Sequence, residues 1–110
     1  MPKELRKIMF TADELQAAVI NHCLHAGKAL PKGRIERLQV SKTPEAMVIL
    51  HFDVENANGS EVVLSREAVG AALIRYCMQN DIPLPRSAGK GVQPDGDGIA
   101  LMCNFVYAVD

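Results

Sequence analysis

Two short basic segments have the residue types and spacing most suited to binding chemistry. Lys32 and Arg34 follow one Leu-Pro pair, and Arg86 and Lys90 follow a second Leu-Pro pair later in the chain. Lysine and arginine attract anions, and arginine can hold a carboxylate or phosphate through two parallel hydrogen bonds. We therefore predict these four residues as candidates for binding an anion, a phosphate backbone or an acidic partner surface. The alternative is that they only keep exposed loops hydrated.

The histidines offer metal binding or acid–base catalysis, but their surroundings favour neither. His22 and His25 are i, i+3 neighbours on an expected helix and can share one ion, yet no further ligand pair has recognisable spacing. His51 lies near Asp53, and a histidine–carboxylate pair can move protons, but no nucleophile motif accompanies it. We predict no metal, no cofactor and no catalytic residue.

The cysteine count and the overall composition exclude several classes of protein. Cysteines at 23, 77 and 103 are too unevenly spaced for a disulfide framework or a zinc ribbon, and each falls at a position expected to face the core. The 110 residues are 48% apolar with a net charge of −1, and no apolar run approaches the ~18 residues of a membrane span. The N-terminal segment lacks the apolar core of a signal peptide. We expect a cytoplasmic protein that does not bind a membrane.

Hydrophobic periodicity predicts the elements that must position these side chains. Two helices are expected over residues 12–26 and 66–80, each with a buried stripe at i, i+3, i+4 spacing. Thr11 and Glu14 form a capping-box pattern before the first helix, and Gly27 is suited to end it in the left-handed conformation. The remaining segments are predicted as strands over 5–10, 34–41, 46–55, 61–64 and 99–109, with a loop over 86–98.

An internal repeat is the strongest organisational signal in the chain. A shift of 54 residues places Thr11 on Ser65, and it superposes identical residues at Ala17, Ala18, Ile20, Cys23, Leu30 and Pro31 on Ala71, Ala72, Ile74, Cys77, Leu84 and Pro85. A shift of 53 aligns the late strands, with Leu50 on Cys103 and Phe52 on Phe105. We interpret the chain as two strand–helix–strand–strand units related by a pseudo-twofold axis. The alternative is that two amphipathic helices merely look alike.

These elements predict an α+β fold, a two-layer sandwich in which a mostly antiparallel sheet carries two helices on one face. A unit of about 54 residues buries too little apolar surface to be stable alone, so both repeats, at about 5–55 and 60–109, share one domain over 1–110. The sheet face away from the helices is expected to carry Met47, Ile49, Met102 and Val106. An apolar face of this kind is usually covered, and we expect a second copy of the chain to cover it.

One segment resembles a known kind of domain. The run from Ala71 to Cys77, followed by the Ile-Pro-Leu-Pro-Arg segment ending at Arg86 and by Lys90, resembles short uncharacterised bacterial domains of unknown function. The resemblance implies a small stand-alone bacterial cytoplasmic protein and identifies no activity.

The leading functional hypothesis is a non-enzymatic binding or adaptor module that acts as a homodimer, with a protein partner as a further option. The second hypothesis is nucleic-acid or anion binding through the basic loops. It gains weight from the charge distribution, because residues 1–42 hold eight Lys or Arg and four Asp or Glu. The third is a small enzyme or enzyme subunit that uses His51 with Asp53, or Arg86 and Lys90 as an anion clamp.

Overall fold

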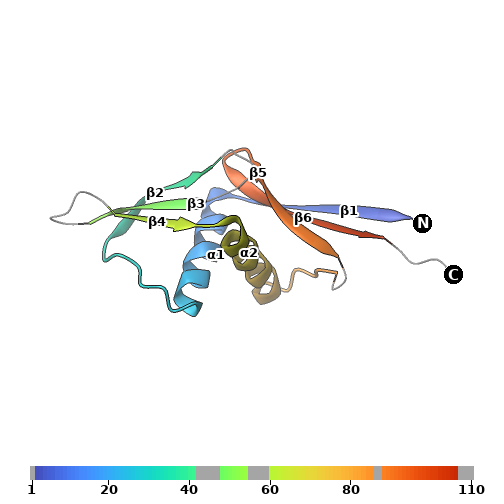
Figure 1. Ribbon diagram of the computed structural model, residues 1–110, viewed down its shortest axis with the longest axis horizontal. Coiled ribbons are helices and arrows are strands. Elements are labelled where there is room, and N and C mark those ends of the chain that lie inside the picture. The colour runs from blue at the N-terminus through green and yellow to red at the C-terminus, as the bar shows by residue number, and fades with distance from the viewer. Residues whose placement is uncertain (1, 42–47, 55–59, 86–87, 107–110) are drawn as a thin grey trace.

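The computed structural model describes residues 2–41, 48–54, 60–85 and 88–106. Two helices and six strands give the predicted α+β fold (Figure 1). In chain order the elements are β1 (Lys3–Phe10), α1 (Ala12–His25), β2 (Arg34–Val40), β3 (Val48–Asp53), β4 (Ser60–Leu64), α2 (Arg66–Gln79), β5 (Gly89–Asp95) and β6 (Gly98–Val106). Within the described part of the chain, no helix is both long enough and apolar enough to cross a membrane.

The strands form two antiparallel sheets of three rather than one continuous sheet. The orders are β1-β6-β5 and β2-β3-β4, and the two sheets project on opposite sides of the helices (Figure 1). Each sheet takes one strand from the other half of the chain, because β1 pairs with β6 and β4 pairs with β3. Neither half therefore contains a complete sheet of its own.

The strand registers correct the predicted alignment of the late strands. Leu50 lies opposite Val62, and Leu101 lies opposite Ile8. Since Ile8 and Val62 are equivalent under the shift of 54, the residue that corresponds to Leu50 is Leu101, two positions before the Cys103 expected from the sequence. The order strand–helix–strand–strand occurs twice with matching strand pairings, while descent of the two halves from one duplicated sequence stays a prediction.

The two helices begin and end with related but unequal caps. The capping box of α1 is confirmed: the Glu14 amide donates to Thr11 Oγ1 at 3.2 Å, and the Thr11 amide donates to Glu14 Oε1 at 2.9 Å. Ser65 caps α2 by accepting from the Ala68 amide at 3.2 Å, without a carboxylate in return. The first helix ends with Gly27 at φ +70°, as predicted.

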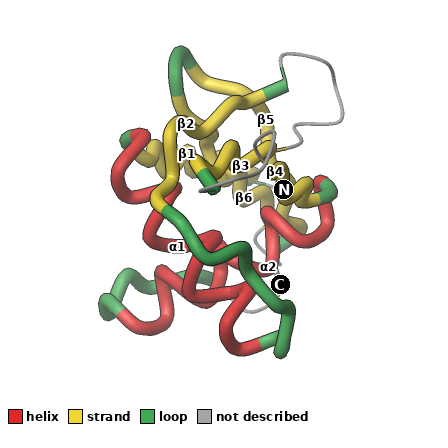
Figure 2. Tube along the Cα trace, turned by 90° about the vertical axis from the view of Figure 1, so that its left-hand side faces the viewer, coloured by secondary structure: helices red, strands yellow, loops and turns green. Residues whose placement is uncertain are grey.

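The helices pack against each other beneath the strands, and they cross as they lead away from the sheets (Figures 1 and 2). Lys28, just past the end of α1, donates from Nζ to the carbonyl of Val63, just before α2 begins, at 3.3 Å. At the other end, the ring of Phe10 meets the edge of the Tyr76 ring at a centroid distance of 5.7 Å. A third contact joins the later turns of both helices, where Asn21 Nδ2 donates to Gln79 Oε1 at 2.6 Å.

The core lies between the helices and the inner faces of both sheets. The buried stripe predicted for each helix is confirmed, except that two residues also expected in it are not buried: Ala26 is an exposed cap residue and Tyr76 is half-buried. The residues buried in the helices are Leu15, Ala18, Val19, Cys23, Val69, Ala72, Leu73 and Cys77. All three cysteines are buried with free thiols, as predicted for small apolar core residues.

The strand β5 occupies a segment that the sequence predicted as loop. Glycine and proline are depleted in strands, and Gly89–Asp95 contains two glycines and Pro94. The segment is an edge strand that pairs with β6 alone, where a proline can be accommodated because one side of the strand needs no backbone donor. Its Val92 is buried against the core and fixes the strand to the helices.

Candidate functional site

The predicted basic residues are divided between the two sheets. Lys32 and Arg34 are exposed at the start of β2, whereas Lys90 lies at the start of β5. Arg86 falls outside the described residues. The segments after α1 and α2 lead away from each other toward the two sheets (Figure 1), and Arg34 and Lys90 line separate pockets. Lys90 therefore does not lie near Lys32 and Arg34, as predicted, but shares a pocket with residues of α2.

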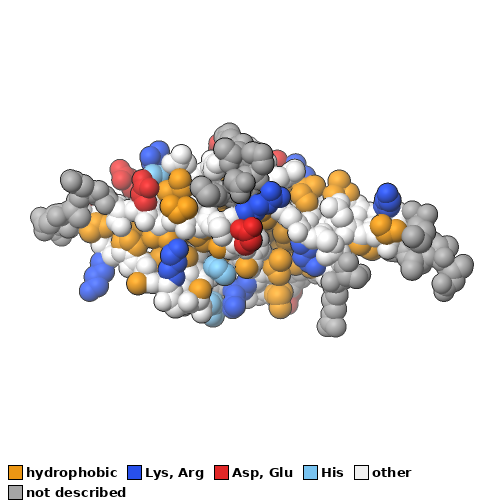
Figure 3. Space-filling view, viewed as in Figure 1, with side chains coloured by type: hydrophobic (Ala, Val, Ile, Leu, Met, Phe, Trp, Pro, Cys, Tyr) orange, Lys and Arg blue, Asp and Glu red, His pale blue; other side chains and the backbone are white. Residues whose placement is uncertain are grey.

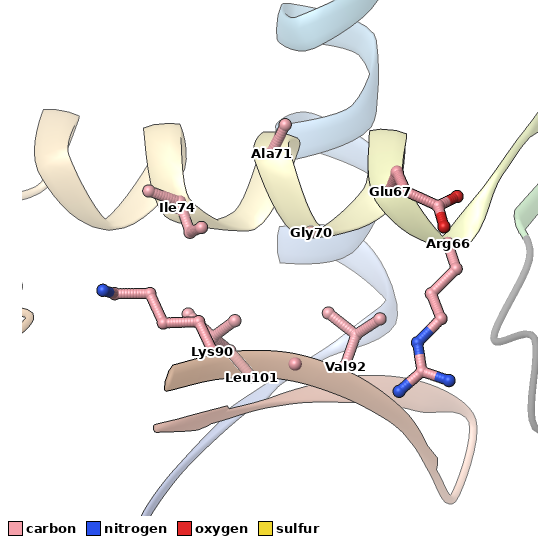
Figure 4. Close-up of a pocket in the computed structure, with 9 residues that line it drawn as sticks. Arg66, Glu67, Gly70, Ala71, Ile74, Lys90, Val92 and Leu101 are labelled. Carbon is pink, nitrogen blue, oxygen red and sulfur yellow. The ribbon is translucent and has the colours of Figure 1, made fainter. Parts of the chain in front are cut away.

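A pocket of about 490 Å³ lies between α2 and β5 (Figure 4). Arg66 and Glu67, in the first turn of α2, stand at one end of it, and Lys90 stands at the other. The wall between the charged ends is apolar and consists of Ala71, Ile74, Val92 and Leu101. The pocket thus combines an apolar surface with two cations and one carboxylate.

Gly70 on α2 opens this pocket. A Cβ atom at Gly70 would meet Val92 Cγ1 at 3.9 Å, which is an ordinary contact. The backbone φ of Gly70 is not positive, so neither sterics nor backbone conformation calls for glycine here. Glycine in a helix interior costs about 0.5–1 kcal/mol relative to alanine, yet the only local consequence is open space beside Val92.

The charges of the pocket are unequal at its two ends. Lys90 is half-buried, and its Nζ donates to the carbonyl of Ala88 at 3.2 Å. This bond orients the ammonium group, which carries three donors in total. At the opposite end, the carboxylate of Glu67 and the guanidinium of Arg66 point away from each other (Figure 4). Among the lining residues, the carboxylate thus lies at the Arg66 end, and the Lys90 end carries a cation alone.

The corresponding place in the first half of the chain is built differently. The pocket between α1 and β2 has a volume of about 380 Å³. Gln16, the fifth residue of α1, stands where α2 has Gly70 as its fifth residue. Ile35, next to Arg34 in the same wall, supplies an apolar side chain from the edge strand. The first half thus has a glutamine side chain at the helix position where the second half has a glycine.

The outer face of the β1-β6-β5 sheet, on the side away from the helices, is apolar. Leu5 is 64% exposed, Met9 65% and Val106 49%, and Met102 is half-buried beside them. Beyond Met102, Gly89 and Gly91 lack side chains, and a hollow of about 630 Å³ opens over this edge of the sheet. Apolar side chains reach the surface along much of the molecule in the view of Figure 3.

A salt bridge crosses this outer face. Lys7 Nζ on β1 lies 3.0 Å from Asp95 Oδ1 on β5, on the far side of the central strand β6. Ala100 of β6, in register with Met9 on one side and Gln93 on the other, is fully buried. The outer face therefore presents apolar side chains together with charges of both signs.

The outer face of the β2-β3-β4 sheet carries a polar network instead. His51 Nε2 lies 2.9 Å from Gln39 Oε1, and His51 Nδ1 lies 3.4 Å from Glu61 Oε1. The predicted partner Asp53 is on the same strand, and the contacts of the ring go to the two neighbouring strands. Of the residues predicted for an apolar face, Ile49 lies here, half-buried, and Met47 is outside the described residues.

The remaining candidates for chemistry are shielded. Burial raises the pKa of the Cys23 and Cys77 thiols, which keeps both protonated near neutral pH and makes them poor nucleophiles. Among the residues that the structure describes, no group of three or more His, Cys, Asp or Glu is placed to hold a metal ion. His22 lies beside α2, where it lines a pocket with Arg75 and Met78.

Comparison of the chain with protein-family models, with curated proteins and with solved structures finds no match. The geometry of the pocket and of the two outer faces therefore carries the functional argument. The sequence identified Lys90 but not Arg66 or Gly70. The signal that could have found Gly70 was its place in the repeat, opposite Gln16 in the middle of an otherwise regular helix.

Proposed function

We propose that the protein is a non-enzymatic binding module that acts as a homodimer through the outer face of the β1-β6-β5 sheet. The observation that carries this proposal is the exposure of Leu5, Met9 and Val106 on a single sheet face. Exposed apolar patches on small domains typically mark interaction surfaces, because their burial removes apolar area from water.

The cross-strand register supports a second copy as the occupant of this face. Leu5, Asn104 and Gly89 form one row across the sheet, with an exposed side chain at one edge and a bare backbone at the other. A twofold axis along β6 places β1 of each copy over β5 of the other. Leu5 then faces the hollow at Gly89 of the opposite copy, as an isologous interface requires.

The charges of the face are compatible with self-association. Lys7 and Asp95 contribute one cation and one anion to the same surface. A patch of a single sign would repel its own copy, whereas a patch with both signs can align opposite charges across a twofold axis. The outer face of the other sheet, with its network around His51, offers polar groups that are already bonded to one another.

Light scattering coupled to size-exclusion chromatography tests the proposal at protein concentrations from about 5 to 200 µM, a range that brackets typical weak homodimers. We expect the wild type to approach twice the 12.0 kDa mass of one chain. Leu5→Glu buries a charge in the interface and is expected to give a monomer with an unchanged circular dichroism spectrum.

Val63→Glu is the matched control, since Val63 is 47% exposed on the outer face of the other sheet. This variant is expected to remain a dimer. A wild type that stays at the mass of one chain across the whole range would refute the dimer. So would a Leu5→Glu variant that dimerises like the wild type.

Nucleic-acid binding through the basic loops is the alternative proposal. It is supported by the exposure of Lys32 and Arg34, which leaves both side chains open to a phosphate backbone. It has less support than dimerisation, because these residues lie in one sheet and Lys90 lies in the other. An enzymatic role has the least support, since the ring of His51 contacts Gln39 and Glu61 rather than the predicted partner Asp53.

A further inference from the structure

We propose that the pocket between α2 and β5 binds a small organic anion, an aliphatic carboxylate held by Lys90 with its chain against Ile74 and Val92. The pocket opens on the helix side of β5, and it shares Arg66, Lys90, Gly91 and Val92 with the hollow on the proposed dimer face. The two proposals are therefore tested with separate readouts.

The shape of the pocket comes from a residue that the fold does not need. Gly70 weakens α2 as a helix, and a Cβ atom would fit at its position with a nearest contact of 3.9 Å. The glycine leaves open a volume of about 490 Å³ between two cations. A ligand that fills this volume explains why a glycine stands there. In the first half, Gln16 occupies the same helix position, and the edge strand opposite carries Ile35 beside Arg34.

The chemistry of the walls selects the class of ligand. Ala71 is exposed and Ile74 is half-buried, so an aliphatic chain can pack against these two side chains above the buried Val92 and Leu101. The net charge of Arg66, Glu67 and Lys90 is positive, which favours a ligand with one negative group. Because Glu67 stands at the Arg66 end, the Lys90 end is the better place for a carboxylate (Figure 4).

A hydrogen bond to the backbone orients the ammonium group of Lys90 for binding a carboxylate. Its bond to the Ala88 carbonyl uses one of three N–H donors and holds the side chain along the pocket wall. The aliphatic stem of Lys90 adds apolar surface, and its charged end lies at the end of the pocket away from Arg66 (Figure 4). A carboxylate can accept the remaining donors while its chain extends toward Gly70.

A titration followed by ¹H–¹⁵N NMR tests the site with three probes: hexanoate, acetate and hexan-1-ol. We expect hexanoate to shift the amide signals of Gly70, Ile74 and Val92 saturably. Acetate lacks the chain and hexan-1-ol lacks the charge, so each is expected to bind at least about tenfold more weakly.

Three substitutions separate the contributions of shape and charge. Gly70→Gln copies the residue of the first helix, improves helix propensity and fills the pocket, so it is expected to abolish hexanoate binding while the melting temperature is maintained or raised. Lys90→Gln is expected to weaken hexanoate binding about tenfold or more, and Arg66→Gln to weaken it less. Gln16→Ala and Arg34→Gln, in the first half, are the matched controls and are expected to bind like the wild type.

The proposal is overturned if hexanoate causes no saturable shifts, or if the shifted amides lie away from α2 and β5. Equal affinity for hexanoate and hexan-1-ol would remove the role of the charge, and equal affinity for hexanoate and acetate would remove the role of the apolar wall. Unchanged binding by Gly70→Gln would equally refute the site. The Leu5→Glu variant is expected to bind hexanoate normally, so that loss of the dimer and loss of the pocket are read separately.

Discussion

The two halves of the molecule have the same order of elements but use their equivalent positions differently. In the first half, α1 has a complete capping box and a glycine at its C-terminal end, and Gln16 occupies the space between helix and edge strand. In the second half, α2 has a simpler cap, a strained residue at its end and Gly70 in its middle. The first half is the better optimised for helix stability, and the second half holds the larger pocket.

The two sheets also differ, in how polar their outer faces are. The outer face of β2-β3-β4 carries a polar network around His51, whereas that of β1-β6-β5 leaves Leu5 and Met9 more than 60% exposed. Features that lower the stability of a fold, such as a glycine inside a helix or an uncovered apolar face, typically occur at functional surfaces. Both features in this molecule involve β5 or the sheet to which it belongs.

The largest expected effect tests whether the two halves fold as one unit. Leu50 and Leu101 occupy equivalent positions in the central strands β3 and β6, and both are 0% exposed. Replacement of either by alanine removes buried methyl groups and leaves a cavity, so each is expected to lower the free energy of unfolding by about 3 kcal/mol. Urea denaturation followed by circular dichroism measures both.

Because β1 and β4 are exchanged between the halves, each variant is expected to unfold in a single transition. Val63→Ala, at an exposed position, serves as the control and is expected to change stability by no more than about 0.5 kcal/mol. Two separate transitions, or hydrogen-exchange protection retained in β2-β3-β4 after Leu101→Ala has unfolded β6, would show that the halves are independent.

Local patterns in the sequence were sufficient to predict both helices and their buried faces. The i, i+3, i+4 spacing from Leu15 to Cys23 reports burial directly, and the Thr11–Glu14 pattern is a local hydrogen-bonding arrangement that needs no distant partner. The strand β5 was missed because its residues favour loops, and only pairing with β6 makes Gly89–Asp95 extended. The split into two sheets depends on the exchange of β1 and β4, which no local pattern encodes.

The candidate site was predicted only in part for the same reason. Lys90 was recognised from its basic neighbours, yet the groups that surround it in the pocket come from α2, more than a dozen residues earlier. Conversely, the expected grouping of Lys32 and Arg34 with Lys90 assumed that equivalent loops lie close together. The exchange of strands directs the two loops to opposite sheets (Figure 1).

The ends of the two helices provide a paired test of intermediate size. Gly27 and Asp81 follow the C-terminal caps of α1 and α2, and both have positive φ, at 70° and 55°. Gly27→Ala introduces the left-handed penalty of an L-residue and is expected to lower stability by about 1 kcal/mol, although nothing lies within 4 Å of the new Cβ. Asp81→Gly removes that penalty and is expected to raise stability by about 0.5–1 kcal/mol.

Thermal denaturation of the two variants beside the wild type measures both effects. Just after each helix, a backbone amide donates to a carbonyl in the last turns of the helix: Lys28 to the carbonyl of Cys23, and Ile82 to that of Cys77. The two helix ends therefore share one hydrogen-bonding pattern. Opposite signs for the two substitutions would show that backbone conformation governs the difference. A destabilising Asp81→Gly would instead mean that the aspartate side chain is required at the end of α2.

The smallest expected effect concerns pH and the start of α1. The hydrogen bond from the Thr11 amide, with a smaller contribution from Tyr76, lowers the pKa of Glu14 below its usual 4.5. A carboxylate with a lowered pKa in the folded state stabilises the protein above its unfolded pKa, and this stabilisation is lost as the pH falls through the folded pKa. In α2, Ala68 stands at the corresponding position and contributes nothing of this kind.

The stability difference between the wild type and Glu14→Gln is therefore expected to shrink as the pH is lowered from 7 to 3. It should stay well under ~1 kcal/mol throughout, because the carboxylate is accessible to water and screened. Glutamine retains a side-chain acceptor for the Thr11 amide, so the comparison isolates the charge from the hydrogen bond.

Ala68→Glu is the reciprocal variant: it gives α2 the capping box of α1, and it should increase stability at pH 7 but not at pH 3. If both variants respond equally at the two pH values, the asymmetry between the helix starts does not depend on the carboxylate charge.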